Sequence, residues 1–226
     1  MKNKWTPEEL EEIESQLSCP SGANGIEVGN SMNQFNISMT LDTINWLNLE
    51  NDHSILEIGH GNCGHLKQIL EKGNNIQYNG LEISETMHQE AVANNASAIS
   101  NGNISFQLYD GLNMPFPDDS FDKIMTVNTI YFWTEPQQLL TEIARVLKPQ
   151  GQCIITYSQK DFMVNLPFVQ NKFKLYDNEA ITNLVSNSHM HCLEIIDRHE
   201  RVKLNTDELI DRKYSMAKLV TNEYHQ

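Results

Sequence analysis

Short apolar blocks alternate along the chain with stretches in which apolar residues recur at helical spacing. From residue 54 onward this pattern predicts alternating strands and helices, which favours a mostly parallel sheet with helices on both faces. Five blocks predict the parallel strands: Ser54–Ile58, Ile76–Ile83, Ile104–Tyr109, Asp122–Val127 and Cys153–Tyr157. Two later blocks, Leu193–Asp197 and Tyr214–Val220, predict closing strands in antiparallel orientation. The predicted fold class is α/β, with a seven-stranded sheet flanked by helices.

The N-terminal fifty residues have helical spacing and precede the first strand. Thr6-Pro7-Glu8-Glu9 predicts a helix start, because Thr6 is a good cap, proline suits the first helical position and Glu9 completes a capping box. Glycine and asparagine in Ser21–Gly29 predict a loop, and Ile37–Leu47 predicts a second helix with Met39 and Ile44 facing inward. We therefore divide the chain into a helical extension, residues 1–50, and a sheet domain, residues 51–226.

Later helices are predicted between the strands of the sheet domain. A first one carries an apolar stripe, a second is capped by Ser84, and two more follow the fourth and fifth strands. Their predicted extents are Leu66 to Leu70, Ser84 to about Ile99, about Glu135 to Leu147 and Asp177 to about Asn187. Lys148–Gly151 leads from the third of these helices into the fifth strand.

Three glycines follow the first strand, at Gly59, Gly61 and Gly64, and a helix follows them. Glycine allows a sharp turn and the close approach of a ligand, and a helix start offers unpaired N–H groups. The spacing matches the dinucleotide fingerprint, which alone is a weak signal. Glu57, two positions before the first glycine, would repel a pyrophosphate but suits a ligand with ammonium and sulfonium groups.

Leu56–Gly64 resembles the first motif of class I S-adenosylmethionine-dependent methyltransferases. Asp110–Asp122 resembles the family stretch between the third and fourth strands, and Glu142–Gly151 resembles the signature before the fifth strand. The resemblance covers about Ser54 to Tyr157 and is to the small-molecule group that includes menaquinone-biosynthesis and sterol-type enzymes. It implies a Rossmann-like fold and S-adenosylmethionine as the cofactor, with the N-terminal extension as part of a lid.

The resemblance also implies which residues bind the cofactor. The acidic residue Glu57 would lie near the methionine end, and Asp110 with Gly111 would contact the adenine. Glu82 ends the second strand, where a carboxylate can accept hydrogen bonds from both ribose hydroxyls, as it does in dinucleotide sites. The complete predicted set is Glu57, Gly59, Gly61, Gly64, Glu82, Ile83, Asp110, Gly111 and Asn128.

The catalytic residues are not identified by the sequence. A general base is needed only if the acceptor loses a proton, and His60, His65 and Tyr131 are the candidates near the cofactor. Asn128 and Tyr131 occupy the outer positions of the Asn-Pro-Pro-Tyr motif of DNA amino-methylating enzymes, but both prolines are missing, which argues against base methylation. Tyr131, Phe132 and Trp133 are either pocket or core residues.

Composition narrows the class of partner. The chain of 226 residues has a formal net charge of -14 and no basic run, which argues against nucleic acid as substrate. The four cysteines are dispersed, and His189-Met190-His191 lacks a third ligand, so we expect reduced thiols and no metal site. With no apolar signal segment and no run long enough for a membrane span, we expect a cytoplasmic protein.

The acceptor is expected to be a small molecule, but the sequence does not name it. The expected substrate-binding segments are Met32–Met39 and Lys160–Tyr176, although the second segment equally suits an interface that would make the protein a homodimer. Two other functions stay open. One is a nicotinamide-dependent oxidoreductase, favoured by the glycines and Glu82 and opposed by Glu57. The other is a non-catalytic S-adenosylmethionine-binding protein.

Overall fold

Seven strands form one sheet, as the sequence pattern predicts. The structure is a computed structural model and describes residues 5–100, 102–203 and 209–221. The strands are β1 (Ser54–Ile58), β2 (Gln77–Glu82), β3 (Ile104–Leu108), β4 (Phe121–Val127), β5 (Leu147–Ser158), β6 (Met190–Lys203) and β7 (Leu209–Thr221). Their order is β3-β2-β1-β4-β5-β7-β6, with β1 to β5 parallel and β7 antiparallel to both of its neighbours. The prediction of antiparallel closing strands is confirmed.

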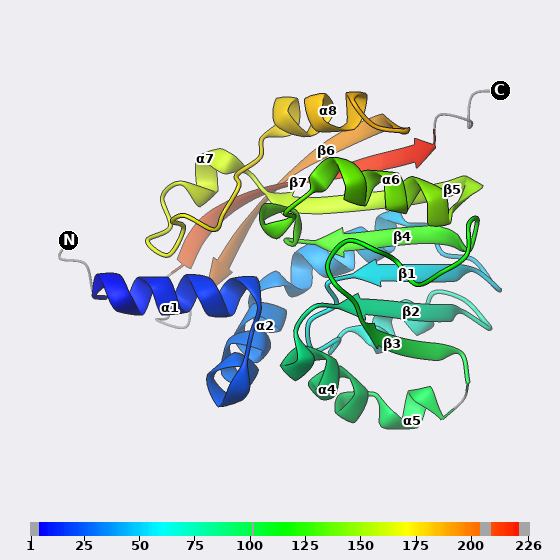
Figure 1. Cartoon of the computed structure of the whole chain (residues 1–226), viewed down its shortest axis with the longest axis horizontal. Helices are drawn as coiled ribbons and strands as arrows, with labels where there is room; N and C mark the ends of the chain where they lie inside the picture. Colours follow the sequence, from blue (N-terminus) through cyan, green and yellow to red (C-terminus); the bar gives the residue numbers. More distant parts are fainter. Residues whose placement is uncertain (1–4, 101, 204–208, 222–226) are drawn as a thin grey trace.

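Helices cover both faces of the sheet (Figure 1). They are α1 (Pro7–Ser18), α2 (Gly22–Trp46), α3 (Leu66–Leu70), α4 (Glu85–Asn94), α5 (Ala96–Ile99), the 3-10 helix η1 (Ile130–Phe132), α6 (Pro136–Val146), α7 (Lys160–Met163) and α8 (Asn178–Ser186). One apolar core packs α6 and α8 against the sheet, and the other packs α2, α3 and α4 against the opposite face. In β1 the alternation of side chains sends Ile55 to the second core and Leu56 and Ile58 to the first.

The predicted helix caps are present. The Thr6 hydroxyl accepts a hydrogen bond from the Glu9 backbone, and the Glu9 carboxylate accepts one from the Thr6 backbone, which is the capping box. Ser84 caps α4 through the Met87 backbone N–H, and Asp177 caps α8. These side chains occupy N–H groups that would otherwise lack partners at the helix starts.

The prediction of a loop at Ser21–Gly29 is wrong, because α2 begins at Gly22 and runs to Trp46. Two of the glycines that suggested a turn, Gly25 and Gly29, are required for packing. A Cβ at Gly29 would lie 2.4 Å from the sulfur of Met87, and one at Gly25 would lie 2.7 Å from the carbonyl carbon of Pro20. Close packing of the helix on its neighbours outweighs the poor helix propensity of glycine, which costs about 1 kcal/mol per residue.

Two element boundaries also differ from the prediction. The helix after Ser84 is interrupted at Asn95, which ends α4 and precedes the short α5. Strand β5 begins at Leu147 instead of Cys153, because Leu147 already pairs with Phe121. A register shift follows that pair, so the Lys148–Gly151 segment forms an irregularity within the strand and not a separate turn.

Helix α1 is tied to the segment that follows α7. The buried carboxylate of Glu14 accepts hydrogen bonds from the backbone N–H groups of Gln170, at 3.0 Å, and Lys172, at 2.8 Å. The Lys172 ammonium also donates to the hydroxyl of Ser15. Two segments far apart in sequence, both predicted as covers of the substrate region, are thus held together by one carboxylate. The division at residue 50 into extension and sheet domain stays a prediction.

No described helix combines the length and the apolar character needed to cross a bilayer.

Replacing Glu14 with alanine is expected to lower the free energy of unfolding by about 1–3 kcal/mol, because two backbone donors lose a charged partner. Hydrogen exchange should speed up at the amides of Gln170 and Lys172. The matched control is Glu11→Ala, since Glu11 lies exposed on the same helix. Equal urea midpoints and equal exchange rates for both variants would show that Glu14 does not hold the two segments together.

Candidate active site at the carboxyl ends of the strands

A cavity of about 250 Å³ lies at the carboxyl ends of the central strands. The arrowheads of β1, β2 and β4 point toward α1 and α2 in Figure 1, and residues from all five elements contribute to its wall. In open α/β sheets ligands bind at this edge. The wall is formed by Leu17, Ser18, Pro20, Gly29, Met32, Asn33, Asn36, Thr40, Glu57, Ile58, Gly59, His60, Gly61, Asn62, His65, Glu82, Ile83, Met87, Tyr109, Asp110, Gly111, Val127, Asn128, Thr129, Phe132, Trp133 and Thr134.

The structure brings most of the predicted site residues together on this wall. The predicted cofactor-binding residues found there are Glu57, Gly59, Gly61, Glu82, Ile83, Asp110, Gly111 and Asn128. Of the base candidates, His60 and His65 line the cavity, whereas Tyr131 does not. Gly64 also lies off the wall. Their predicted roles in binding and catalysis stay predictions.

The turn after β1 has an alternating left-handed backbone. Gly59, Gly61 and Cys63 have φ angles of 71°, 58° and 46°. A Cβ added to Gly61 would meet no atom within 4 Å, so this side of the turn is open. Gly64 does not share the left-handed conformation. Its hydrogen is needed for packing, because a Cβ there would lie 3.0 Å from the Asn33 amide nitrogen of α2.

The carboxylate of Glu82 joins the end of β2 to this turn. One oxygen accepts a hydrogen bond from the Gly61 N–H at 2.9 Å. The other accepts from the N–H groups of Ile83, at 2.8 Å, and Ser84, at 3.0 Å. A carboxylate offers about four acceptor sites, so buried Glu82 retains capacity for a hydroxyl-bearing ligand.

Asp110 forms a second acidic position at the rim. Its carboxylate accepts hydrogen bonds from the backbone N–H groups of Leu112 and Asn113 and from the Asn113 side chain. The Asn113 side chain is the main cause that lowers the pKa of Asp110 below its ordinary value, and the backbone N–H groups add to it. The carboxylate therefore stays ionised and fixed at the loop after β3.

Glu57 lies beneath the turn in a buried polar network. His65 Nε2 lies 2.9 Å from both carboxylate oxygens, and the Tyr78 hydroxyl donates to one of them at 2.6 Å. Burial raises the pKa of Glu57, but the charge of His65 and hydrogen bonds from His65 and Tyr78 outweigh it, so the pKa is lowered. Burial likewise opposes the charged form of His65, but Glu57 raises its pKa overall. The two form a buried ion pair.

Cys63 completes a group of three metal-ligand types with Glu57 and His65, all buried, with ligand atoms within 4.8 Å of one another. Sequence spacing gave no sign of this group. The donors are already engaged, since Glu57 accepts from His65 and Tyr78, and the Cys63 sulfur lies 3.2 Å from the Tyr78 hydroxyl. Burial also raises the pKa of Cys63 well above its ordinary value, which disfavours the thiolate that metals bind.

His60 is neutral in this environment. Burial lowers its pKa more than the nearby carboxylates Glu82 and Glu57 raise it. Its Nδ1 lies 2.7 Å from the Gly61 carbonyl, which can only accept, so the proton sits on Nδ1. Nε2 is then the basic atom, and it is buried without a hydrogen-bond partner among the described residues. A role as general base would require access to this atom.

Tyr131 belongs to the core beside Asn128. Its hydroxyl donates to the Asn128 side-chain oxygen at 2.9 Å, lies 3.1 Å from the Ser158 carbonyl and accepts from the Ser158 N–H. Burial raises its pKa far above the ordinary value. Phe132 and Trp133 do line the cavity, so two of the three aromatic residues after β4 lie where a pocket role requires.

Sequence reasoning missed three amides on α2. Asn30, Asn33 and Asn36 are three residues apart and so lie on one face of the helix. Asn33 donates to the Asn62 side chain of the glycine turn, and Asn62 donates to Asn30, each at 2.9 Å. The spacing was visible in the sequence, but it falls between the predicted loop, which ends at Gly29, and the predicted helix, which begins at Ile37. Asn33 and Asn36 do lie in the Met32–Met39 segment that was expected to bind substrate. Within Lys160–Tyr176, no described residue lines the cavity; Phe173 packs on Phe132 from outside.

These residues fit S-adenosylmethionine. The open side of the Gly61 turn leaves room for a ligand backbone, Glu82 offers unused acceptor capacity, and the wall carries three carboxylates suited to a cationic ligand. A pyrophosphate would meet the same carboxylates without a compensating Lys or Arg among the described wall residues.

Replacing His65 with glutamine is expected to destabilise the protein by about 3–5 kcal/mol, because Glu57 loses its charged partner. The pKa of His65 is raised from 6.5, so its contribution is full below 6.5 and is lost as pH rises through the folded value. The pKa of Glu57 is lowered from 4.5, so its contribution is full above 4.5 and is lost as pH falls through the folded value.

Urea unfolding at a series of pH values should therefore show the largest gap between wild type and His65→Gln from about pH 4.5 to 6.5, with a smaller gap in alkaline buffer. His53→Gln, the same exchange in the loop before β1, serves as the control for the substitution itself. A gap for His65→Gln that does not change with pH would mean that the pair is not ionised.

Comparisons with known proteins agree with this geometry. Residues 56–155 match the family model of a methyltransferase domain. The uncharacterized methyltransferase YdaC of Bacillus subtilis is 29% identical over 122 residues, which are 53% of this chain and 64% of that protein. The O-methyltransferase resE of Aspergillus sclerotiorum is 26% identical over 66% of this chain and 59% of its own length. The chain thus spans less than two thirds of the length of both relatives.

The fold is shared with solved structures. A chain in the complex between the Haloferax volcanii Trm112 methyltransferase activator and a methyltransferase superposes with a TM-score of 0.69, at 16% identity, over 85% of this chain and 92% of that one. The domain match, the relatives and the placement of the motif residues around one cavity lead to the same conclusion. Residues 56–155 are similar to a methyltransferase domain, and the fold is shared with a solved methyltransferase complex.

Proposed function

We propose that this methyltransferase transfers the methyl group of S-adenosylmethionine to a small-molecule acceptor. The observation that carries the proposal is the composition of one cavity wall. The glycine turn and Glu82 lie on the same wall as the apolar side chains Met32, Phe132 and Trp133. A cofactor held by the first group would present its methyl group inside a cavity that the second group shapes.

When bound, S-adenosylmethionine supplies an electrophilic methyl group on a sulfonium. The residues of this chain then have to bind the cofactor, orient the acceptor and exclude water, and such alignment can supply much of the rate enhancement. The cavity is covered by Leu17 at the end of α1, by Pro20 between the two helices and by Met32 on α2. Residues 1–50 therefore serve as a lid in this proposal, held in place partly by Glu14.

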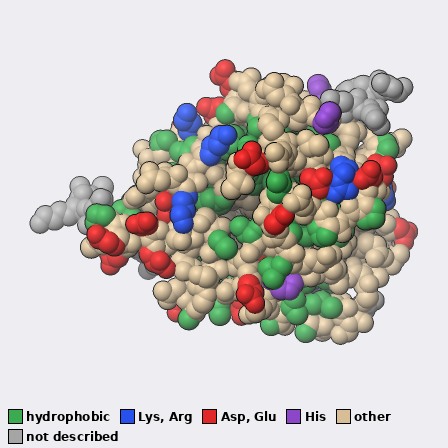
Figure 2. Space-filling view, viewed as in Figure 1, with side chains coloured by type: hydrophobic (Ala, Val, Ile, Leu, Met, Phe, Trp, Pro, Cys, Tyr) green, Lys and Arg blue, Asp and Glu red, His purple; other side chains and the backbone are tan. Residues whose placement is uncertain are grey.

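Among the possible methyl-accepting atoms, the comparisons favour oxygen. The relative resE is named as an O-methyltransferase, and the chain matches it over 66% of the present sequence. Nucleic acid is a poor candidate. The exposed face of α1 carries Glu8, Glu9, Glu11 and Glu12, and Figure 2 shows acidic side chains gathered over this helix. Phosphate groups approaching the cavity from this side would be repelled.

The two alternative functions make different predictions. A nicotinamide-dependent oxidoreductase would bind NADH more tightly than S-adenosylhomocysteine, and a cavity with Glu57, Glu82 and Asp110 does not favour that cofactor. A non-catalytic binding protein would bind S-adenosylmethionine without turning over any acceptor.

Replacing Glu82 with glutamine is expected to weaken binding of S-adenosylhomocysteine at least about tenfold, since a charged hydrogen bond contributes about 1.5–3 kcal/mol. The NH2 group of the new glutamine could also face the Gly61 N–H, so that two donors would meet and the hydrogen bond to the turn would be lost. Calorimetric titration measures the change. The control is Glu85→Gln, which makes the same exchange at an exposed position on α4 and should leave the affinity unaltered. Equal affinities for both variants would remove Glu82 from the binding site.

Incubation with S-adenosylmethionine and a panel of phenols, carboxylic acids, amines and thiols tests the activity itself. We expect formation of S-adenosylhomocysteine to depend on one acceptor class, as followed by mass spectrometry. A protein that binds the cofactor and yields no product on any class would favour the non-catalytic alternative.

A further inference from the structure

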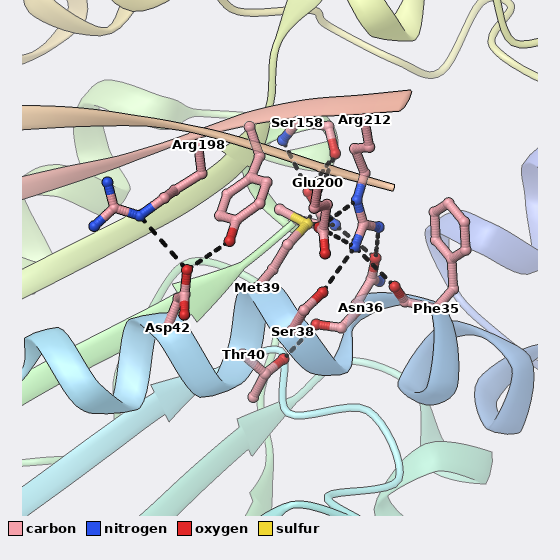
Figure 3. Close-up of polar contacts among 12 residues, drawn as sticks. Phe35, Asn36, Ser38, Met39, Thr40, Asp42, Ser158, Arg198, Glu200 and Arg212 are labelled. Carbon is pink, nitrogen blue, oxygen red and sulfur yellow. Dashed lines mark hydrogen bonds and ion pairs between the residues drawn. The ribbon is translucent and has the colours of Figure 1, made fainter. Parts of the chain in front are cut away.

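Helix α2 places one amide between the cavity and a buried arginine. The side-chain oxygen of Asn36 accepts a hydrogen bond from Arg212 of β7 at 3.1 Å (Figure 3). It accepts another from the Asn128 amide nitrogen at 3.0 Å. Asn36 and Asn128 both line the cavity. Asn128 lies 92 residues after Asn36, and Arg212 lies 176 residues after it, so no local sequence pattern joins them.

The orientation of the Asn36 amide is fixed by groups that only donate. A guanidinium has no acceptor, so the atom facing Arg212 is the amide oxygen. The Asn128 amide is fixed likewise, because its oxygen accepts from the Ser158 N–H at 3.1 Å, which leaves its nitrogen toward Asn36. The Asn36 amide nitrogen, Nδ2, is then the remaining atom, and it donates to no described residue.

Arg212 is itself held rigidly. Its side chain is fully buried, donates to Glu200 at 2.9 and 2.6 Å and stacks over the Phe35 ring at 4.3 Å. It also donates to the Phe35 carbonyl and the Ser38 hydroxyl. Figure 3 shows this arginine reaching from β7 to α2. Since Arg212 is off the cavity wall, it acts on the cavity through Asn36.

The charges on the wall limit the ligand that the free donor can bind. Among the described wall residues the acidic side chains and histidines are Glu57, His60, His65, Glu82 and Asp110, with no Lys or Arg. A carboxylate or phosphate ligand would meet carboxylates without an unpaired cation, because the charge of His65 is already paired with Glu57. A neutral molecule with an oxygen lone pair suits the donor, and Phe132 and Trp133 offer aromatic surface on the same cavity wall.

We propose that Asn36 determines acceptor specificity by donating its Nδ2 hydrogen to the oxygen of a neutral, hydroxyl-bearing aromatic acceptor, with Arg212 as the positioning residue. This inference rests on the proposed function. It adds the substrate class and the residue that selects it. An analogue without the hydroxyl would leave the Asn36 donor unpaired. The site should therefore bind that analogue much more weakly.

The test compares three probes of similar size on protein saturated with S-adenosylhomocysteine. They are para-cresol, para-xylene, which lacks the hydroxyl, and para-toluate, which carries a carboxylate. We expect calorimetry to show para-cresol binding at least about tenfold more tightly than either of the others, a difference of about 1.4 kcal/mol.

The decisive variant is Asn36→Asp, which still accepts from Arg212 and Asn128 but cannot donate. It should lose the preference for para-cresol while retaining S-adenosylhomocysteine binding and thermal stability. The matched control is Gln34→Glu, the same amide-to-carboxylate exchange at an exposed position on α2, which should keep the preference. Arg212→Lys, which retains the charge but not the planar guanidinium, should reduce the preference for para-cresol. If that variant unfolds, the comparison of Asn36→Asp with Gln34→Glu tests the proposal.

Three results would overturn the inference. Para-cresol binding no more tightly than para-xylene would exclude a donor to oxygen, and unchanged preference in Asn36→Asp would exclude Asn36 as that donor. Tighter binding of para-toluate would exclude a neutral acceptor. Failure of wild type to bind S-adenosylhomocysteine would instead remove the proposed function on which the inference rests, so the two failures are distinguishable.

Discussion

The hydrogen bond from the Gly61 N–H to the Glu82 carboxylate is the interaction on which the site depends. It joins the turn after β1 to the end of β2 at 2.9 Å, and the same carboxylate caps the backbone at Ile83 and Ser84. The backbone at Gly59 and Gly61 is left-handed, which favours glycine. Because glycine has no side chain, the turn stays open to a ligand while the Glu82 carboxylate holds it in place. A buried carboxylate needs such partners, so the structure that fixes the turn also prepares an anionic acceptor for the cofactor.

Around this turn the fold surrounds the cavity with buried polar groups. Below it, Glu57 and His65 form an ion pair that Tyr78 completes. Above it, α2 contacts the turn through Asn33, and Arg212 fixes the helix from the opposite side. Buried networks of this kind are costly when incompletely satisfied, so they favour a single arrangement of helix and sheet. Helix α2 is therefore part of the rigid site, although its sequence carries none of the motifs that resemble the methyltransferase family.

The sheet and most of the motif placement could be predicted from the sequence, because strand alternation and the Gly59, Glu82 and Asp110 positions are local signals. The start of α2 could not be predicted, since Gly25 and Gly29 resemble turn residues until Pro20 and Met87 are known to pack on them. Glycine spacing alone could not show that Cys63, and not Gly64, has the left-handed backbone, or that Gly64 is needed for packing against Asn33. The role proposed for Asn36 depends on Arg212, which lies 176 residues away. Such contacts are set by tertiary packing.

The central claim is that this cavity binds S-adenosylmethionine rather than a dinucleotide. The most direct measurement is calorimetric titration of the wild-type protein with S-adenosylhomocysteine and, in parallel, with NADH. The account predicts saturable binding of S-adenosylhomocysteine at one site per chain and no heat of binding from NADH. Binding of NADH alone, or of neither compound, would contradict it.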